Sequence, residues 1–374
     1  VLVRAENRVD IENSAGALGL GLSGLGVGAG ANVSILKGRV ASDIDQSRVY
    51  SSAPVAVEAE NTSVLDSESR MAGVGGTVGI GGAAVVVLVG DDLKDAAADE
   101  FDSGEAGTLS ELQTSVDGDD LDAVDGANGE ALTADERADM EAAGDNAIDD
   151  VAYGTDSQGY RYQTMARITG TATAIDATTD TDSTGISISA VDSVQVDGLA
   201  IGVGASAGLG VGGGVGIVDL AGKSHAYADE ATLTTTGDLV IDAQGIVQDT
   251  DVTAYAGGAG IVGIGAAYIG IDSTPETTAY LGPQAHVEGA DDVRIGASSS
   301  SDVSAEGRGL VAGSVAVGVV IAEVDDSGTT EAYVDTGARV GGGSGQVGSL
   351  DVSATSDQTL GADTGAAAGG IVAG

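Results

Sequence analysis

The stretches Val1-Leu-Val-Arg-Ala5, Val55-Ala-Val-Glu-Ala59 and Ile186-Ser-Ile-Ser-Ala190 begin one pattern, which returns at Leu239-Val-Ile-Asp-Ala243, Val293-Arg-Ile-Gly-Ala297 and Leu350-Asp-Val-Ser-Ala354. The steps between consecutive starts are 54, 131, 53, 54 and 57 residues, so the long step holds one period and a large insertion. A fixed period of this length is typical of repeat proteins, in which each unit buries its apolar face against its neighbours.

The copy that begins at Val293 reads as a series of strands. Val293 and Ile295 alternate with Arg294 and Gly296, which is the period of two of a strand. The serine run 298–301 is expected to turn the chain before a second short strand. Residues 311–324 then place large side chains on odd positions and small ones on even positions. Such a strand suits a packed interior on one side and a second close surface on the other.

Short strands separated by Gly, Ser and Asp turns at a fixed period predict an all-β fold, a parallel β-helix. Coils of about 20 residues would give two to three coils per copy and a rod on the order of 70 Å long. A β-sandwich is the alternative, but its hairpin turns at regular spacing are sparse in this chain. The expected organisation is repeats over residues 1–90, an inserted subdomain over 91–165, and repeats again over 166–374.

The composition limits both the core and the partners. Aromatic residues make up 3% of the 374 residues, with no Trp, whereas Gly numbers 62, so the core is expected to be thin. The net charge is −44, which excludes nucleic acid and disfavours an anionic membrane surface as partners. This lysine-poor, acidic composition indicates a protein from a salt-loving organism, with an acidic protein from a marine bacterium as the alternative. There is no cysteine, hence no disulfide or thiolate metal site.

Two long uncharged runs raise the question of membrane spans. Residues 71–90 and 198–218 carry no charge and are long enough to cross a bilayer as helices. Both runs fall at the same offset of the repeat and are rich in Gly, which disfavours a helix by up to about 1 kcal/mol per residue. No membrane span is expected.

Three blocks carry a resemblance to a known family: Asp302-Val-Ser-Ala305, Gly313-Ser-Val-Ala-Val-Gly318 and Thr330-Glu-Ala-Tyr-Val334. Related pieces are Thr278-Ala-Tyr-Leu281 and His225-Ala-Tyr-Ala228. They resemble the repeats of very large bacterial filamentous surface adhesins, of the leukotoxin type and the filamentous-haemagglutinin-like type. The resemblance implies a right-handed β-helix, secretion, and a scaffold or adhesion role. It brings no catalytic residues with it.

The insertion departs from the repeat pattern. Residues 91–165 hold 22 acidic residues against Lys94, Arg137 and Arg161. The capping box at residues 133–136 predicts a short helix over 134–143, so this segment is expected to be a partly helical lateral subdomain. Its clustered carboxylates suggest a calcium site formed by Asp117, Asp119, Asp120, Asp122 and Asp125. A solvated acidic loop with loosely held counterions is the alternative.

Few other residues could bind a metal, stack on a ligand or take part in catalysis. His225 and His286 sit at different offsets of the repeat and are expected on the surface. Tyr227, Tyr280 and Tyr333 share one offset, but with two to three coils per copy their rings would lie about 10–14 Å apart, too far to stack. No distinctive acid–base cluster exists, so no catalytic residue is nominated and the chain is not expected to be an enzyme.

These observations favour a structural component of an exported cell-surface fibre, stalk or filament, adhesive and extracellular. Both ends of the sequence hold incomplete copies, so the expected partners are further repeats or head-to-tail subunits, with surface glycans or other cells as contacts. The alternative is a binding module, in which the acidic insertion recognises a glycan, a receptor or a divalent cation.

Overall fold

The fold is built from strands throughout the part of the chain that the structure describes. The computed structural model describes residues 1–90, 162–178, 183–342, 346–370 and 372–373, and every helix or strand assigned there is a β-strand. The all-β prediction is therefore confirmed for these residues. The helix expected over 134–143 lies outside the described residues.

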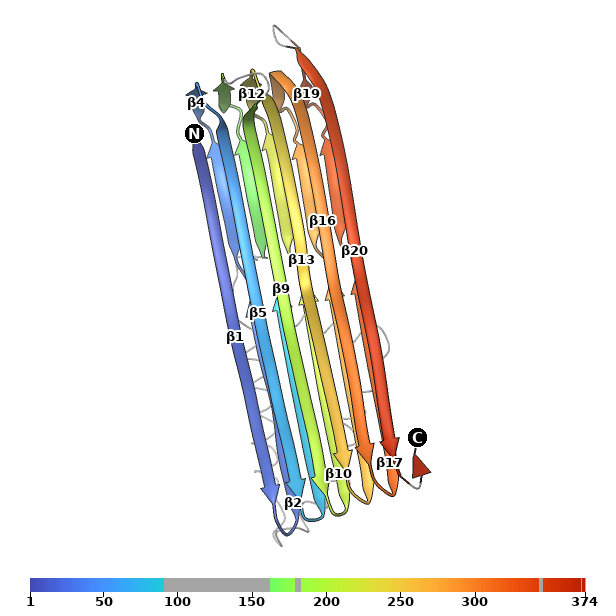
Figure 1. Ribbon diagram of the computed structural model, residues 1–374. Helices are drawn as coiled ribbons and strands as arrows, with labels where there is room; N and C mark the ends of the chain where they lie inside the picture. The colour runs from blue at the N-terminus through green and yellow to red at the C-terminus, as the bar shows by residue number, and fades with distance from the viewer. Residues whose placement is uncertain (91–161, 179–182, 343–345, 371, 374) are drawn as a thin grey trace.

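Six long strands form the main sheet, here called the long sheet. They run parallel and side by side from the first copy to the last (Figure 1). Their bounds are β1 (Leu2–Gly21), β5 (Val55–Gly75), β9 (Thr184–Ser206), β13 (Asp238–Ala259), β16 (His286–Ala312) and β20 (Val347–Gly369).

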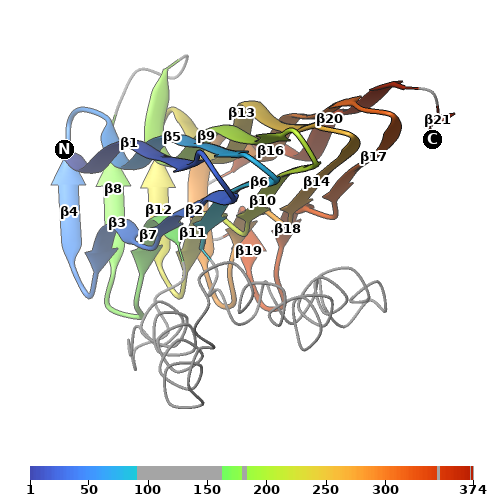
Figure 2. The same ribbon diagram turned by 90° about the horizontal axis from the view of Figure 1, so that it is seen from below.

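At the end of each long strand the chain turns sharply and runs back in a second strand. These returning strands form the glycine-rich sheet, which faces the long sheet as a second layer (Figure 2). The end where the two sheets are joined is called the turn end below. The strands are β2 (Leu25–Leu36), β6 (Val78–Val89), β10 (Leu209–Leu220), β14 (Val262–Ser273), β17 (Val315–Asp326) and β21 (Val372–Ala373).

Shorter strands complete each passage. The short sheet continues the second layer through β3 (Arg39–Asp45), β7 (Gln163–Thr169), β11 (Lys223–Asp229), β15 (Glu276–Leu281) and β18 (Thr329–Val334). The closing strands, which lead back to the long sheet, are β4 (Arg48–Ser51), β8 (Ala174–Ala177), β12 (Thr232–Thr235), the first residues of β16, and β19 (Arg339–Val340).

One sequence repeat makes one complete coil. Leu2 pairs with Ala56 in the long sheet, and Leu209 pairs with Val262 in the glycine-rich sheet, so each strand pairs with its equivalent one period away. All of these pairings are parallel. The prediction of two to three coils per copy is therefore wrong. A coil here has two layers and reaches 20 residues along its long strand, far more than a coil of about 20 residues in all.

The dimensions change accordingly. Neighbouring strands lie about 4.8 Å apart, so the six long strands extend only about 24 Å along the stacking direction, not about 70 Å. The long dimension instead runs along the strands, where the 20 residues of β1 span about 65 Å at about 3.3 Å each.

The serine run at residues 298–301 does not turn the chain, because β16 passes through it without a break. The inner face at this height is polar, and it offers partners to serine. Ser299 Oγ donates to Ser356 Oγ at 2.9 Å and accepts from Thr330 Oγ1 at 2.7 Å. Ser299 therefore has partners for its hydroxyl within the strand, whereas Ser301 Oγ is buried and has no hydrogen-bond partner among the described residues.

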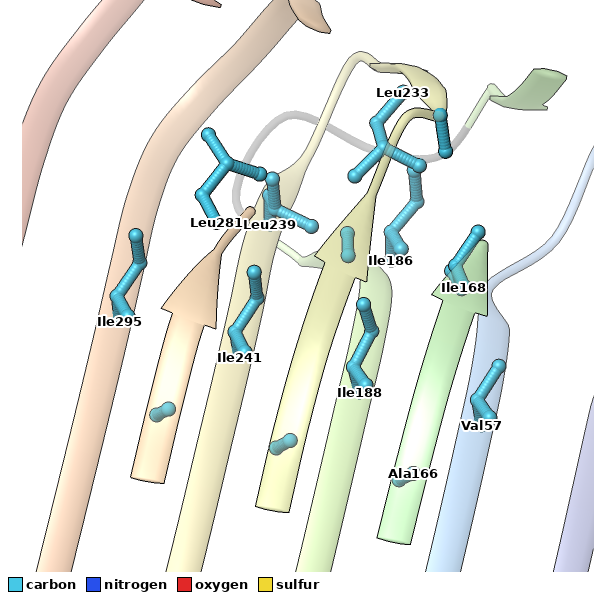
Figure 3. Packing of buried hydrophobic residues seen from close by; sticks show 14 of the residues in the cluster. Val57, Ala166, Ile168, Ile186, Ile188, Leu233, Leu239, Ile241, Leu281 and Ile295 are labelled. Atoms are coloured by element: carbon cyan, nitrogen blue, oxygen red, sulfur yellow. The ribbon is translucent and has the colours of Figure 1, made fainter. Parts of the chain in front are cut away.

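An aliphatic core fills the half of the molecule away from the turn end. The long sheet contributes fully buried residues such as Ile186, Ile188 and Leu239, and the facing strands contribute Ile168 and Leu281 (Figure 3). The side chains stack in register because each coil repeats the same residue types at the same height. This part of the fold follows the ordinary rule that branched apolar side chains line the interior.

The turn end reverses that rule. A Cβ atom added to Gly204 would lie 1.8 Å from the carbonyl oxygen of Val211, and one added to Gly212 would lie 2.0 Å from that of Gly257. The two sheets thus meet backbone to backbone, and only glycine fits between them. In β17 the small residues Ala316 and Gly318 point inward, whereas Val317 points outward and is 42% exposed. The small face, not the large one, is the interior here.

Candidate functional site

The residues expected to bind calcium cannot be placed. Asp117, Asp119, Asp120, Asp122 and Asp125 all lie within residues 91–161, outside the described part of the chain. Among the described residues no group of three or more His, Asp or Glu side chains is arranged to hold a metal ion. The calcium site therefore stays a prediction.

The insertion begins and ends at two neighbouring positions of the coil. In the regular coils two residues connect the glycine-rich strand to the short strand, as Ala221 and Gly222 connect β10 to β11. Gly90 and Tyr162 occupy the same two places in the second coil: Ala221 N donates to Val89 O at 2.8 Å, and Lys223 N donates to Tyr162 O at 3.2 Å. β7 begins at Gln163, so the coil resumes a few residues before the expected boundary at 165.

A ladder of tyrosines lies on the outer face of the short sheet. The ring centroids of Tyr227 and Tyr280 are 4.7 Å apart, those of Tyr280 and Tyr333 are 5.0 Å apart, and both pairs are stacked. The prediction that these rings are too far apart to stack is wrong, because one repeat advances the chain by a single strand spacing. Burial raises the pKa of Tyr280 above its usual value, with further contributions from Tyr227 and Tyr333. The three residues are called the tyrosine ladder below.

The ladder continues as a row of contacts across all five strands of the short sheet. Arg167 Nη1 donates to Tyr227 Oη at 3.3 Å, and Arg167 Nη2 donates to Asp43 Oδ2 at 2.7 Å. Four contacts of this row thus join the first five coils in succession. Stacked or offset aromatic pairs contribute about 0.5–1.5 kcal/mol beyond their burial, so the row stabilises the register between coils.

A second row on the same sheet carries charge. Lys223 donates to Glu276 Oε2, and His225 Nε2 lies 3.1 Å from Glu276 Oε1. Burial lowers the pKa of His225, although the Glu276 carboxylate opposes this. The pKa of Glu276 is lowered although burial acts to raise it, because the hydrogen bond from Lys223 and the charges of His225 and Lys223 outweigh the burial. His286 lies in β16, on a different strand, so the two histidines do not meet.

A buried polar cluster lies beside the insertion point. Asp192 in β9 is 5% exposed and accepts from Asn61 Nδ2 at 2.9 Å and from Thr164 Oγ1 at 3.2 Å. Tyr162 Oη and Ser63 Oγ form a hydrogen bond of 2.8 Å in which either hydroxyl can donate. Asn61 Nδ2 donates a further hydrogen bond to Tyr162 Oη. Burial raises the pKa of Asp192 to about 6, against the effect of its hydrogen bonds. Burial and the charge of Asp192 raise the pKa of Tyr162, which therefore stays neutral.

The hollows in the described part do not resemble an enclosed ligand site. The cavity beside Asp192 measures about 20 Å³, which is room for no more than one water molecule. A wide hollow of about 870 Å³ lies on the outer face of the long sheet near the turn end, and it is lined by Ile201, Val203, Tyr255, Arg308 and Leu310 among others. It is open to solvent, and its arginine is already paired with Glu306 at 2.8 Å and Asp363 at 3.0 Å.

Comparison with protein-family models, curated proteins and solved structures gave no match. No helix long and apolar enough to cross a bilayer occurs in the described ranges. The uncharged runs 71–90 and 198–218 instead form pairs of strands joined at the turn end.

Sequence reasoning missed the tyrosine ladder and the buried Asp192 cluster. The ladder was within reach, since Tyr227, Tyr280 and Tyr333 recur at the repeat spacing of 53 residues. Asp192 was within reach as well, since it continues the alternation of Ile186, Ile188 and Ala190 and so falls on the face that these apolar residues bury.

Proposed function

We propose that this chain is a stretch of a right-handed parallel β-helix and serves as a structural part of an exported cell-surface fibre. The observation that supports the proposal best is the in-register stacking of coils. Within the described residues β1 pairs with β5 along one edge only, and β20 pairs with β16 along one edge only. Each outer edge is a row of backbone N–H and C=O groups that is a template for a further coil.

The side chains on the outer face of the short sheet also support the stacking of coils in a fibre. The row that runs from Asp43 to Tyr333 joins successive coils, and it ends at an outer ring face that matches the next rung of the same ladder. A further coil of the same sequence, or a head-to-tail subunit, would pair with β20 in the long sheet, whereas the next rung of the ladder would belong to a short strand paired with β18. A head-to-tail contact of that kind generates an open filament.

The acidic composition fits a fibre that works in salt. With a net charge of −44, neighbouring coils repel one another, and at 1 M salt screening reduces the range of this repulsion to about 3 Å. An adhesive role, the extracellular location and the salt-loving source are parts of the same proposal, and they rest on the composition and on the resemblance to filamentous surface adhesins.

Electron microscopy of the native material, with and without residues 91–161, tests the proposal. We expect thin fibres with a strand spacing of about 4.8 Å along their axis. Joining Gly90 directly to Tyr162 restores the two-residue connector of the other coils, so the shortened protein is expected to keep both its β-structure and its fibres.

The outcomes separate the two functional readings. Fibres that persist and still attach to cells after the deletion support a structural and adhesive stack of coils. Fibres that persist but no longer attach would assign recognition to the insertion, which is the binding-module alternative. Compact particles with covered ends in the native material would contradict the fibre.

A further inference from the structure

The molecule separates its charge from an apolar face. The net charge is −44, yet the outward face of the glycine-rich sheet is almost free of charge from the turn end upward. Five rows of side chains cross this face, each row taking one residue from β2, β6, β10, β14 and β17. The only charged residue in these five rows is Glu323, on β17 and beyond the two residues of β17 that pair with β21. These rows are called the apolar face below.

The apolar face is large enough to be an interface. Five strands about 4.8 Å apart and ten residues of about 3.3 Å each give an area of about 800 Å². A stable protein–protein contact buries about 800 Å² per partner, whereas ordinary monomers expose apolar patches of a few hundred Å². Val27, Ile264 and Val317 on this face are 47%, 37% and 42% exposed, so the burial of large side chains is incomplete in a single copy.

The opposite side of the turn end is a smaller patch. On the outer face of the long sheet only the two rows nearest the turns are free of charge, about 13 Å by 29 Å, or about 400 Å². The next row contains Arg70, which pairs with Glu68, and Arg308, which pairs with Asp363. A bilayer would surround both sides to the same depth, so this asymmetry favours a partner that covers one face.

The shape of the apolar face is complementary to the same face of a second copy. Its third row is small on four of the five strands and forms a shallow groove there, through Ala29, Gly82, Gly213 and Ala266, whereas Val319 occupies this row on β17. The row before it is uniformly large: Val27, Ile80, Val211, Ile264 and Val317. A ridge beside a groove is self-complementary about a two-fold axis parallel to the groove. That axis also reverses the strands, so the ends opposite the turn ends of the two copies point away from each other.

We infer that two copies of this chain pack back to back through the apolar face, with the ridge of each copy against the groove of the other. This pairing is lateral, and it goes beyond the end-to-end stacking of the proposed function. In a longer array of coils it would repeat along the axis and produce a fibre of two parallel stacks.

A pair of glutamate substitutions tests the inference. Ile264 on the apolar face and Val203 on the outer face of the long sheet are 37% and 39% exposed, and both lie near the turn end. In sedimentation of the 374-residue chain at high KCl, we expect a dimer that Ile264→Glu weakens about 100-fold, because an unpaired charge would be buried. Val203→Glu is expected to leave the dimer unchanged. A monomeric wild-type protein, or equal weakening by both variants, would overturn the inference.

Cysteine protection gives a second readout that does not depend on the glutamate variants. The chain contains no cysteine, so Ala266→Cys and Ala312→Cys each introduce a single thiol, on the apolar face and on the long sheet respectively. We expect the rate of alkylation of the thiol at 266 to fall as the protein concentration rises, because dimers cover it. The rate of alkylation of the thiol at 312 is expected to stay constant. Protection at 266 in a monomer would mean that another segment of the same chain covers the face. Flotation of monomers with phosphatidylcholine vesicles would mean that lipid does. Either result would overturn the pairing.

Discussion

Replacing Gly212 by alanine is expected to lower the free energy of unfolding by about 3 kcal/mol or more. The new methyl group would lie 2.0 Å from the carbonyl oxygen of Gly257 and 2.6 Å from that of Gly202, so backbone closes the site on both sides. Neither sheet can yield at one residue without disturbing the coils paired with it. Denaturant unfolding at a fixed salt concentration measures the loss.

The neighbouring residue supplies the control. Gly213 lies on the same strand and faces outward, where the nearest atom to an added Cβ is the Ala266 oxygen at 3.7 Å. Gly213→Ala is expected to be neutral or to stabilise by up to about 1 kcal/mol, since alanine restricts the unfolded chain. Equal stability of the two variants would show that the sheets do not meet backbone to backbone at the turn end.

Replacing Asp192 by asparagine is expected to stabilise the protein by about 3 kcal/mol at pH 7. The pKa of Asp192 is about 6 in the fold against 3.8 for an ordinary aspartate, so the folded state binds the proton more tightly than the unfolded state. The protonated carboxyl therefore supports the fold fully below about pH 4, and this support is lost as the pH rises through 6. Asparagine keeps the shape of the side chain without the charge.

The pH dependence distinguishes this effect from a general relief of repulsion. The gain from Asp192→Asn is expected to be small at pH 4, to grow between pH 4 and 6, and to stay constant above that, following the folded pKa of about 6. Asp302 is exposed on the long sheet, and Asp302→Asn removes the same charge, with an expected change within about 0.5 kcal/mol at every pH. A similar gain from both variants would show that Asp192 does not carry a buried charge.

The class of fold could be predicted from the sequence, but the size of a coil could not. The alternation of Val293 and Ile295 with polar residues marks strands, and the period marks the stack. The same alternation does not show where a strand bends. The run at 298–301 looks like a turn because serines are common in turns, yet β16 passes through it, and Ser299 hydrogen-bonds to Ser356 and Thr330 across the coil.

The inner and outer faces could not be assigned from hydrophobicity alone. In most folds the larger apolar side chains point inward, and this holds for Ile186 and Leu239. At the turn end the two layers approach so closely that Gly204 and Gly212 must face inward, which forces the valines of the same strands outward. Large apolar residues alternate with small ones in both cases, with serine beside Ile186 and with glycine beside Val203 and Val211, and the distance between the layers decides which face is buried.

The most direct test of the account is whether one sequence repeat advances the chain by one strand. Glu12 and Ser304 lie in the same row of the long sheet, in β1 and β16, four strands apart through Asp66, Asp197 and Asp251. Because the chain has no cysteine, spin labels can be attached at these two positions alone and their separation measured by pulsed electron resonance. One coil per repeat predicts a backbone separation of about 19 Å, whereas two or three coils per repeat would place the labels about 38–58 Å apart and contradict the account.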